Sequence, residues 1–162
     1  MTNVLRTARL DLVLLEPEPA RALATGTNPD GHTWAPGYPL AASLLYAELT
    51  TAAADGGRPL GAFGTYQIVR REDDAVIGDA GFLGPPDATG AVHLAVVITE
   101  LARNRGYATE AVSALLEWAR GQDGLTCVLA DTTRSNRASR RLLERVGMHR
   151  VGTDGELLYY MV

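Results

Sequence analysis

The sequence predicts one α/β domain of the α+β type over residues 1–162, with a mixed, mostly antiparallel central sheet of about six to seven strands flanked by helices. Three observations lead to this class. Short aliphatic and β-branched runs separated by turn residues fill much of the chain. Two segments in the second half have helical periodicity, and a strand-rich hairpin closes the sequence. A chain of 162 residues is long enough to bury a real core.

Seven segments have the composition of strands: 5–16, 65–71, 75–83, 91–100, 125–131, 149–151 and 156–162. The second, third and fourth are joined by short turns, so they should form an antiparallel meander. Segment 125–131 lies between two helical segments, an arrangement that favours parallel pairing with segment 91–100. The last two segments should pair as a hairpin around residues 152–155.

Four segments are predicted to be helical: 18–24, 40–54, the stretch from Gly106 to Arg120, and 137–146. In the second of these, Leu44, Leu45 and Leu49 should cover the core. Residues 25–40 between the first two helices are rich in Gly, Asn and Pro and should form a loop.

The stretch 103–121 predicts an anion site. A strand rich in Val, Leu and Ile precedes it, and the helix that follows Gly106 has apolar residues at 111, 112, 115, 116 and 119 on one face. The first four N–H groups of a helix have no helical partner, and Gly106 lets the chain approach a ligand closely. A phosphate would fit there. The alternative is an Arg-Gly helix start that binds nothing.

Two common phosphate signatures are absent, since the chain has no G-x-G-x-x-G at this position and contains no Lys for a P-loop. Residues 103–108 instead match R-x-x-G-x-A, within the longer string RGYATEA from Arg105. This resembles the acyl-CoA-binding motif of the GNAT superfamily of N-acyltransferases, in particular its RimJ/RimL-like branch. The resemblance spans residues 5–160 except for 26–57. It implies that the fourth and fifth strands, 91–100 and 125–131, splay apart to admit the pantetheine arm of acetyl-CoA.

A second motif, SNRASRRLLERVGM from Ser135, resembles the family segment on the helix after the fifth strand. The resemblance implies that Asn136 bonds the pantetheine arm, and an amide suits this because it both donates and accepts. A helix cap alone is the competing interpretation. Together the two motifs imply these cofactor-binding residues: Val96, Val97, Ile98, Arg103, Asn104, Arg105, Gly106, Tyr107, Ala108, Thr109, Asn136 and Ser139.

The catalytic candidates are His93 and Ser139. His93 stands where the branch commonly has Glu, and imidazole titrates near neutral pH, so it could take a proton from an ammonium directly or through water; a packed structural His is the alternative. Ser139 would donate a hydrogen bond to the departing sulfur. Leu143 occupies the position of the family's Tyr acid. Asp79 and Glu100 are fallback bases, each better explained as structural.

Trp34 and Tyr38, in the Pro-rich loop, could wall an acceptor pocket or simply pin that loop. Arginines cluster between residues 134 and 150, and those at 137, 141 and 145 share one helical stripe. They could anchor the phosphates of CoA, with an RNA patch or a solvated face as alternatives.

The composition is that of an ordinary globular protein with a formal net charge of −4, so nucleic acid is not an expected partner. Cys127 is the only Cys, which excludes an internal disulfide and a cysteine-based zinc site, and we expect it to be a buried, inert thiol; no metal is predicted. The start of the chain lacks signal-peptide features and no apolar run could span a bilayer, so neither secretion nor membrane binding is expected and the cytoplasm is the default. A homodimer is compatible with the sequence.

The resemblance therefore implies an acetyl-CoA-dependent N-acetyltransferase whose acceptor is a primary amine, on a protein N-terminus or a small molecule. The amine would attack the thioester directly, and a backbone N–H at Val96 or Val97 would stabilise the oxyanion. The first alternative is an inactive acyl-CoA-binding protein, and the second is an interaction domain that binds no ligand at Gly106.

Overall fold

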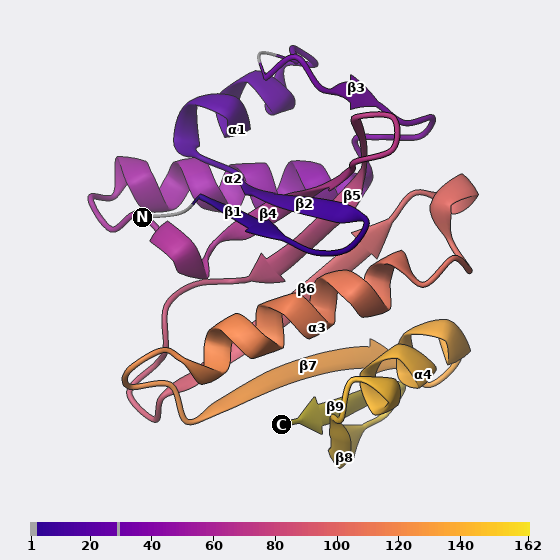
Figure 1. Ribbon diagram of the computed structural model, residues 1–162. Coiled ribbons are helices and arrows are strands. Elements are labelled where there is room, and N and C mark those ends of the chain that lie inside the picture. The colour runs from indigo at the N-terminus through magenta and orange to yellow at the C-terminus, as the bar shows by residue number, and fades with distance from the viewer. Residues whose placement is uncertain (1–2, 29) are drawn as a thin grey trace.

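A computed structural model describes residues 3–28 and 30–162 and contains one mixed sheet with helices on both faces (Figure 1). The strands are β1 Val4–Arg6, β2 Leu10–Leu14, β3 Thr33–Trp34, β4 Thr65–Arg70, β5 Ala75–Phe82, β6 Ala91–Ile98, β7 Cys127–Thr133, β8 His149–Asp154 and β9 Leu157–Met161. The helices are α1 Pro17–Ala24, α2 Ala41–Asp55, α3 Tyr107–Arg120 and α4 Arg137–Arg145. The strand order is β1-β2-β4-β5-β6-β7-β9-β8, and β3 pairs with β5 outside this path.

The predicted fold class is confirmed, although the described chain forms nine strands instead of six to seven. One additional strand arises because segment 5–16 is divided at Thr7 into β1 and β2, which pair antiparallel with each other. The other is β3, a two-residue strand within the predicted loop that pairs in parallel with Ala75 and Val76 of β5. A strand this short leaves no periodic pattern in the sequence, so it could not be predicted.

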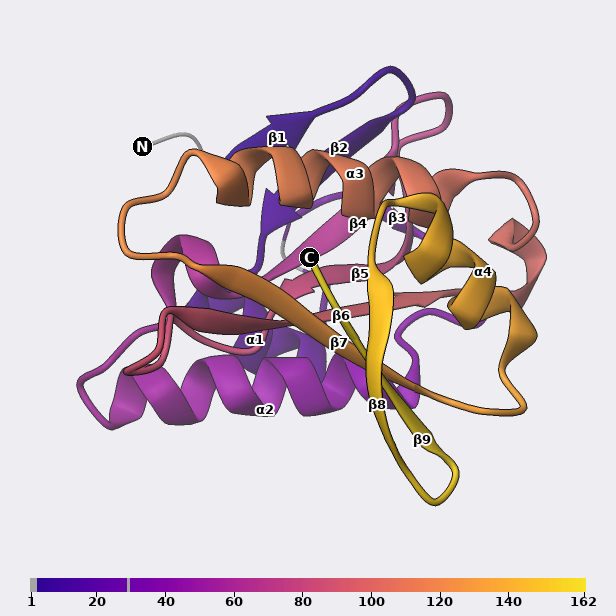
Figure 2. The same ribbon diagram turned by 90° about the horizontal axis from the view of Figure 1, so that it is seen from below.

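Helices α2 and α3 lie on opposite faces of the sheet, as Figure 2 shows. The face under α3 holds the main hydrophobic core, in which Val112 and Leu115 pack with Ile68 and Phe82 of the sheet. The face under α1 and α2 holds a smaller core that includes Leu23, Ala47 and Val76. All five apolar positions predicted for the buried face of α3 are buried, so its amphipathic pattern is confirmed: Ala111, Val112, Leu115, Leu116 and Ala119.

The prediction for α2 was wrong about its buried face. Leu45 and Leu49 are 63% and 36% exposed, Leu44 is also exposed, and the helix instead buries Ser43, Ala47 and Thr50. Ser43 donates a hydrogen bond to the buried carboxylate of Asp79. This bond fixes the rotation of the helix and turns its leucines outward.

Strands β6 and β7 run in parallel but pair over only three residues each, from Ala91 with Cys127 to His93 with Leu129. From Leu129 onward β7 is paired with β9 on its other side. The two strands therefore diverge after His93, which confirms the predicted splaying. Cys127, the first residue of β7, is half-buried rather than fully buried.

Candidate active site

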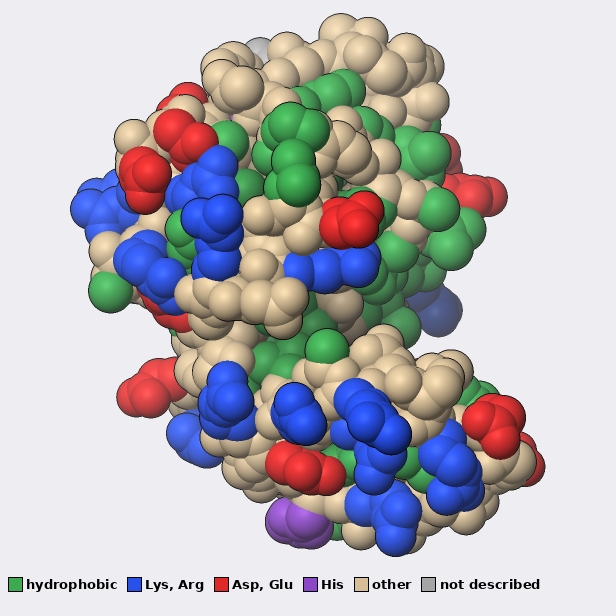
Figure 3. Space-filling model, turned by 90° about the vertical axis from the view of Figure 1, so that its right-hand side faces the viewer, with side chains coloured by type: hydrophobic (Ala, Val, Ile, Leu, Met, Phe, Trp, Pro, Cys, Tyr) green, Lys and Arg blue, Asp and Glu red, His purple; other side chains and the backbone are tan. Residues whose placement is uncertain are grey.

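A groove of about 690 Å³ opens where β6 and β7 diverge. It is lined by the end of β6, the loop into α3 and the exposed side of α4; Figure 3 shows the molecule hollowed between the lobe that carries α4 and the rest, with basic side chains on both sides. The groove contains eleven of the twelve predicted cofactor-binding residues: Val96, Val97, Ile98, Arg103, Asn104, Gly106, Tyr107, Ala108, Thr109, Asn136 and Ser139. The other one, Arg105, is not among its lining residues.

The loop before α3 presents backbone donors to this groove. Gly106 is the N-cap of α3 with φ of 80°, and Asn104 is also left-handed with φ of 62°. The amide of Glu110 donates to the carbonyl of Gly106 at 3.0 Å, which closes the first helical turn. The preceding amides of the first turn, from Tyr107 onward, have no helical partner and lie at the positive end of the helix dipole. This arrangement suits a phosphate group.

The N-terminal hairpin holds this loop in place. Both carboxylate oxygens of Glu110 accept hydrogen bonds from Arg9, one from its backbone N–H at 2.8 Å and one from its Nε at 2.7 Å. The hydroxyl of Thr7 donates to Glu110 as well, and Nη1 of Arg9 donates to the carbonyl of Arg105 at 2.9 Å. Burial alone would raise the pKa of Glu110, but these hydrogen bonds outweigh it and the pKa lies below its usual value.

The free edge of β6 can supply an oxyanion donor. The amide of Thr99, just after β6, donates to the carbonyl of Ile77, and the carbonyl of His93 accepts from the amide of Leu83. The backbone N–H and C=O groups of the odd-numbered residues of β6 therefore point toward β5. Backbone groups alternate in direction along a strand. The amide of Val96 therefore points into the gap between β6 and β7, whereas that of Val97 points toward β5. Of the two donors predicted, Val96 has the required direction.

The α4 side of the groove begins at Asn136, the N-cap of that helix. Its Oδ1 accepts a hydrogen bond from the backbone N–H of Ser139 at 3.1 Å, so the cap interpretation describes the observed contact, and bonding to a pantetheine arm stays a prediction. Leu143 is buried at 3% exposure and packs in the main core.

The arginine stripe predicted on α4 faces the groove: Arg137, Arg141 and Arg145 all line it. Arg140 instead points elsewhere and donates to the carbonyl of Arg134 at 3.2 Å. The groove thus has a cationic wall opposite the amides at the start of α3. Guanidinium groups bind phosphate oxygens with paired hydrogen bonds.

The candidate bases lie in three different places. His93 is half-buried and is the last residue of β6 that pairs with β7; it lines a separate hollow of about 220 Å³ with Leu83 and Leu129. Asp79 is fully buried on β5, and Glu100 is exposed in a short turn after β6. The structure does not bring His93 and Ser139 into one cavity, and the catalytic role of each stays a prediction.

The two predicted acceptor residues pack against each other. Trp34 and Tyr38 form an edge-to-face pair with ring centroids 5.8 Å apart. Tyr38 is buried, and its hydroxyl donates to Asp79 at 3.0 Å, which is the contact of a residue that pins its loop. Neither residue lines the groove, and their part in acceptor binding stays a prediction.

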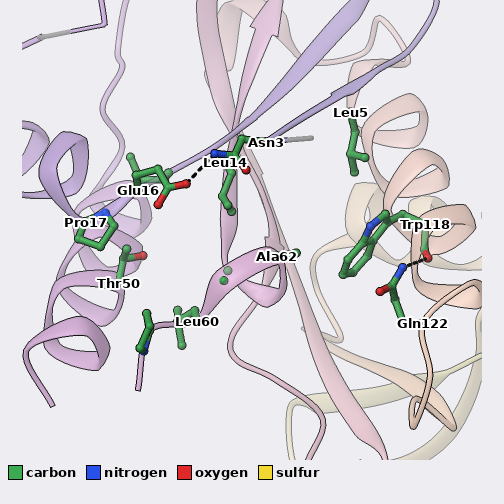
Figure 4. Close-up of a pocket in the computed structure, with 14 residues that line it drawn as sticks. Asn3, Leu5, Leu14, Glu16, Pro17, Thr50, Leu60, Ala62, Trp118 and Gln122 are labelled. Atoms are coloured by element: carbon green, nitrogen blue, oxygen red, sulfur yellow. Dashed lines mark hydrogen bonds between the residues drawn. The ribbon is translucent and has the colours of Figure 1, made fainter. Parts of the chain in front are cut away.

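A second cavity of about 540 Å³ lies at the other end of α3 (Figure 4). Its walls are mainly apolar, with Leu14 and Leu60 on one side and Leu5 and Trp118 on the other, and Glu16 bonds Asn3 at its rim. None of the predicted site residues lines it. Among the described residues there is also no group of three or more His, Cys, Asp or Glu side chains that could hold a metal ion, and no helix long and apolar enough to cross a membrane.

Comparison with known proteins identifies the family of a chain with this fold and groove. Residues 9–149 match the acetyltransferase (GNAT) domain family. The chain belongs to the GNAT acetyltransferase family. The resemblance predicted from residues 103–108 and 135–148 is thereby confirmed.

Three relatives of this GNAT chain are 13% to 29% identical to it over the aligned residues. It is 29% identical over 85 residues to the uncharacterized N-acetyltransferase YjdG of Bacillus subtilis (strain 168); this alignment covers 52% of the chain and 51% of the relative, about half the length of each. An acetyltransferase from Agrobacterium tumefaciens superposes with a TM-score of 0.66 at 23% identity, over 100% of this chain and 95% of the other. RimL, a ribosomal L7/L12 alpha-N-protein acetyltransferase in complex with coenzyme A, superposes with a TM-score of 0.70 at 13% identity. The superposition covers 98% of this chain and 97% of the other. The solved structures support the fold.

Several residues that shape this GNAT site could not be found from the sequence. Arg9 and Glu110 are 101 positions apart, and each is unremarkable in its own segment. Ser43 lies among leucines in a helix whose composition gives no reason to point it inward. Only the two left-handed positions carried a local signal, in the Asn-Arg-Gly string at 104–106.

Proposed function

We propose that the protein is an N-acetyltransferase that moves the acetyl group of acetyl-CoA to a primary amine, either a protein N-terminus or a small molecule, by direct attack on the thioester. One observation carries this proposal. A single groove joins the amides at the start of α3, the arginines of α4 and the open edge of β6. Donors suited to phosphate and to an oxyanion therefore lie along one cavity.

The donors of the groove fit coenzyme A. The amides that follow Gly106 would bind the pyrophosphate, and Arg137, Arg141 and Arg145 would bind further phosphate oxygens. The free edge of β6 beyond Val96 would pair with the amide groups of the pantetheine arm in the manner of an added strand, which leaves the N–H of Val96 for the thioester oxygen.

Acetyl-CoA would supply the activated thioester carbonyl. The N–H of Val96 would stabilise negative charge on the carbonyl oxygen, because a fixed dipole in a water-poor cleft needs no reorganisation when charge develops. His93 would take a proton from the ammonium of the acceptor, directly or through water, and Ser139 would donate a hydrogen bond to the departing sulfur. Positioning of the two reactants and removal of the ammonium proton would together supply most of the acceleration.

A catalytically inactive acyl-CoA-binding protein is the second candidate. Leu143 supports it, because this apolar, buried residue stands where the family resemblance places a Tyr acid. Binding of acetyl-CoA is common to both candidates, and only turnover separates them.

The test has two stages. Titration calorimetry and thermal shift with acetyl-CoA should give measurable heat and a higher melting temperature, because a ligand that binds only the folded state stabilises it. Thiol release is then followed with free N-terminal peptides, amino acids, polyamines and amine antibiotics. Because the chain has no Lys, self-acetylation can contribute background only at its own N-terminus. Binding of acetyl-CoA without release of its thiol in the presence of any amine would favour the inactive candidate. Failure to bind acetyl-CoA would overturn both candidates.

His93 is tested in the same assay. His93→Ala should slow turnover at neutral pH, where the acceptor is an ammonium, and much less at high pH, where the amine is already deprotonated. Turnover by His93→Ala that equals the wild type at all pH values would remove His93 from the mechanism.

A further inference from the structure

A buried polar network connects the sheet to the segment before α2. Asp79 is 0% exposed, although carboxylates are rarely buried without partners. The hydroxyl of Tyr38 donates to its Oδ1 at 3.0 Å, and the hydroxyl of Ser43 donates to its Oδ2. Gln67 in turn donates from Nε2 to the hydroxyl of Tyr38 at 3.1 Å. All four side chains are buried, so no oxygen of the carboxylate depends on solvent.

The network holds the segment that leads through β3 into α2. This segment, residues 30–40, is called here the acceptor segment because it contains Trp34 and Tyr38, the two residues predicted to wall an acceptor pocket. Its backbone joins β5 through Ala35, whose amide donates to Val76 at 3.0 Å. Asp79 is the second attachment point, and it pairs across the sheet with Val97, a groove residue. The pair of Asp79 and Val97 therefore connects the attachment point of the acceptor segment to the wall of the groove.

Two features associated with this network oppose stability. Burial raises the pKa of Asp79 to about 6 although the hydrogen bonds from Ser43 and Tyr38 act in the opposite direction, so the ionised form is unfavourable inside the protein. Turning Ser43 inward also leaves Leu45 63% exposed. Local features that oppose stability are most often retained for function.

We propose that Asp79 is a positioning residue for the amine acceptor: it fixes the acceptor segment and the first turn of α2 beside β6, and so sets the affinity for the amine without affecting that for acetyl-CoA. This inference rests on the proposed function. The acceptor would reach the gap between β6 and β7 from the face that α2 covers, while the phosphate-binding amides lie at the start of α3 on the opposite face.

Single-hydroxyl variants test the proposal. Tyr38→Phe and Ser43→Ala each remove one donor to Asp79 and leave the surrounding packing almost unchanged. We expect each to raise the KM for the amine roughly tenfold or more, the range for losing a hydrogen bond to a charged partner. The Kd for acetyl-CoA should stay within about twofold and kcat should change little. Asp79→Asn, which can still accept one bond, should raise the KM less than Asp79→Ala.

The matched control is Tyr66→Phe. Tyr66 is equally buried on the neighbouring strand β4, and its hydroxyl donates to the carbonyl of Ala62 at 2.9 Å, away from the acceptor segment. This variant should lose similar stability and keep the wild-type KM. Should Asp79→Ala fail to fold, Tyr38→Phe still decides the question.

An unchanged amine KM in Tyr38→Phe, an equal rise in Tyr66→Phe, or a parallel loss of acetyl-CoA affinity would each overturn the positioning role while leaving the proposed function intact. A wild-type protein that binds acetyl-CoA and acetylates no amine would overturn both.

Discussion

Glu110 accepts hydrogen bonds at both carboxylate oxygens from Arg9, which lies 101 positions earlier in the chain. The same arginine donates to the carbonyl of Arg105, directly before the N-cap of α3. The turn between β1 and β2 therefore positions the loop whose amides face the groove. An N-terminal hairpin that contributes no residue to the groove wall is nevertheless part of its support.

Replacing Glu110 should weaken this support. Glu110→Gln should lower the free energy of unfolding by about 1–3 kcal/mol at neutral pH, the range for hydrogen bonds to a charged group. Because the pKa of Glu110 is lowered in the folded protein, the wild-type advantage is present above the usual carboxyl pKa and disappears as pH falls through the lowered value. Urea unfolding across the acid range measures this. Glu117→Gln, on the exposed face of the same helix, is the control and should show neither effect.

Gly106 should tolerate no side chain. Its φ of 80° disfavours other residues, and a Cβ there would lie 3.3 Å from Nη2 of Arg9, on the support just described. Gly106→Ala should raise the Kd for acetyl-CoA about tenfold or more, which calorimetry measures. Gly124 has a similar φ of 78° with open space around it, so Gly124→Ala imposes comparable backbone strain without touching the groove. Equal losses of affinity in the two variants would contradict a specific role for Gly106.

Asp79 should give a pH dependence opposite to that of Glu110. Its pKa is raised to about 6 in the folded protein, against about 3.9 in an unfolded chain. Between these values the folded state binds a proton that the unfolded state does not. The wild type should therefore gain about 2–3 kcal/mol relative to Asp79→Asn as pH falls from about 7 to about 4. Unfolding curves for both proteins over this range test the prediction, and a constant difference would mean that Asp79 does not titrate there.

Because the leucines of α2 point outward, replacing a leucine should cost much less stability in α2 than in α3. Leu45→Ala should change the free energy of unfolding by less than about 1 kcal/mol, because its side chain is largely in water already. Leu115→Ala, in the core beneath α3, should lower it by about 2–5 kcal/mol. Denaturant unfolding of the two variants compares them directly. A large loss in Leu45→Ala would show that α2 is rotated differently in solution.

The elements that local pattern specifies were predictable. α3 combines a full apolar stripe with Gly106 directly before it, and β6 is a continuous aliphatic run, so the strand, turn and helix around the groove follow from the sequence. The motif at 103–108 identified the family, and eleven of the twelve residues predicted to bind the cofactor line one groove.

Features set by contacts between distant segments were not predictable. The rotation of α2 depends on Asp79, which is 36 positions from Ser43, and no periodicity in the helix records that bond. β3 can pair with Ala75 and Val76 because β5 starts before its pairing with β6, which begins at Gly78. The position of His93 in a separate hollow likewise depends on how neighbouring strands end, a property that no single segment encodes.

The short pairing between β6 and β7 determines how firmly the two halves of the sheet are held together. Only the residues from Ala91 to His93 pair with β7 in the described chain, so few backbone bonds keep β7, β8 and β9 aligned with the other strands. A molecule that contacts both the β6 edge and α4 would act as an additional cross-link between the halves. Amide hydrogen exchange in β7 and α4 should then slow when the groove is filled, even at positions that the ligand does not touch.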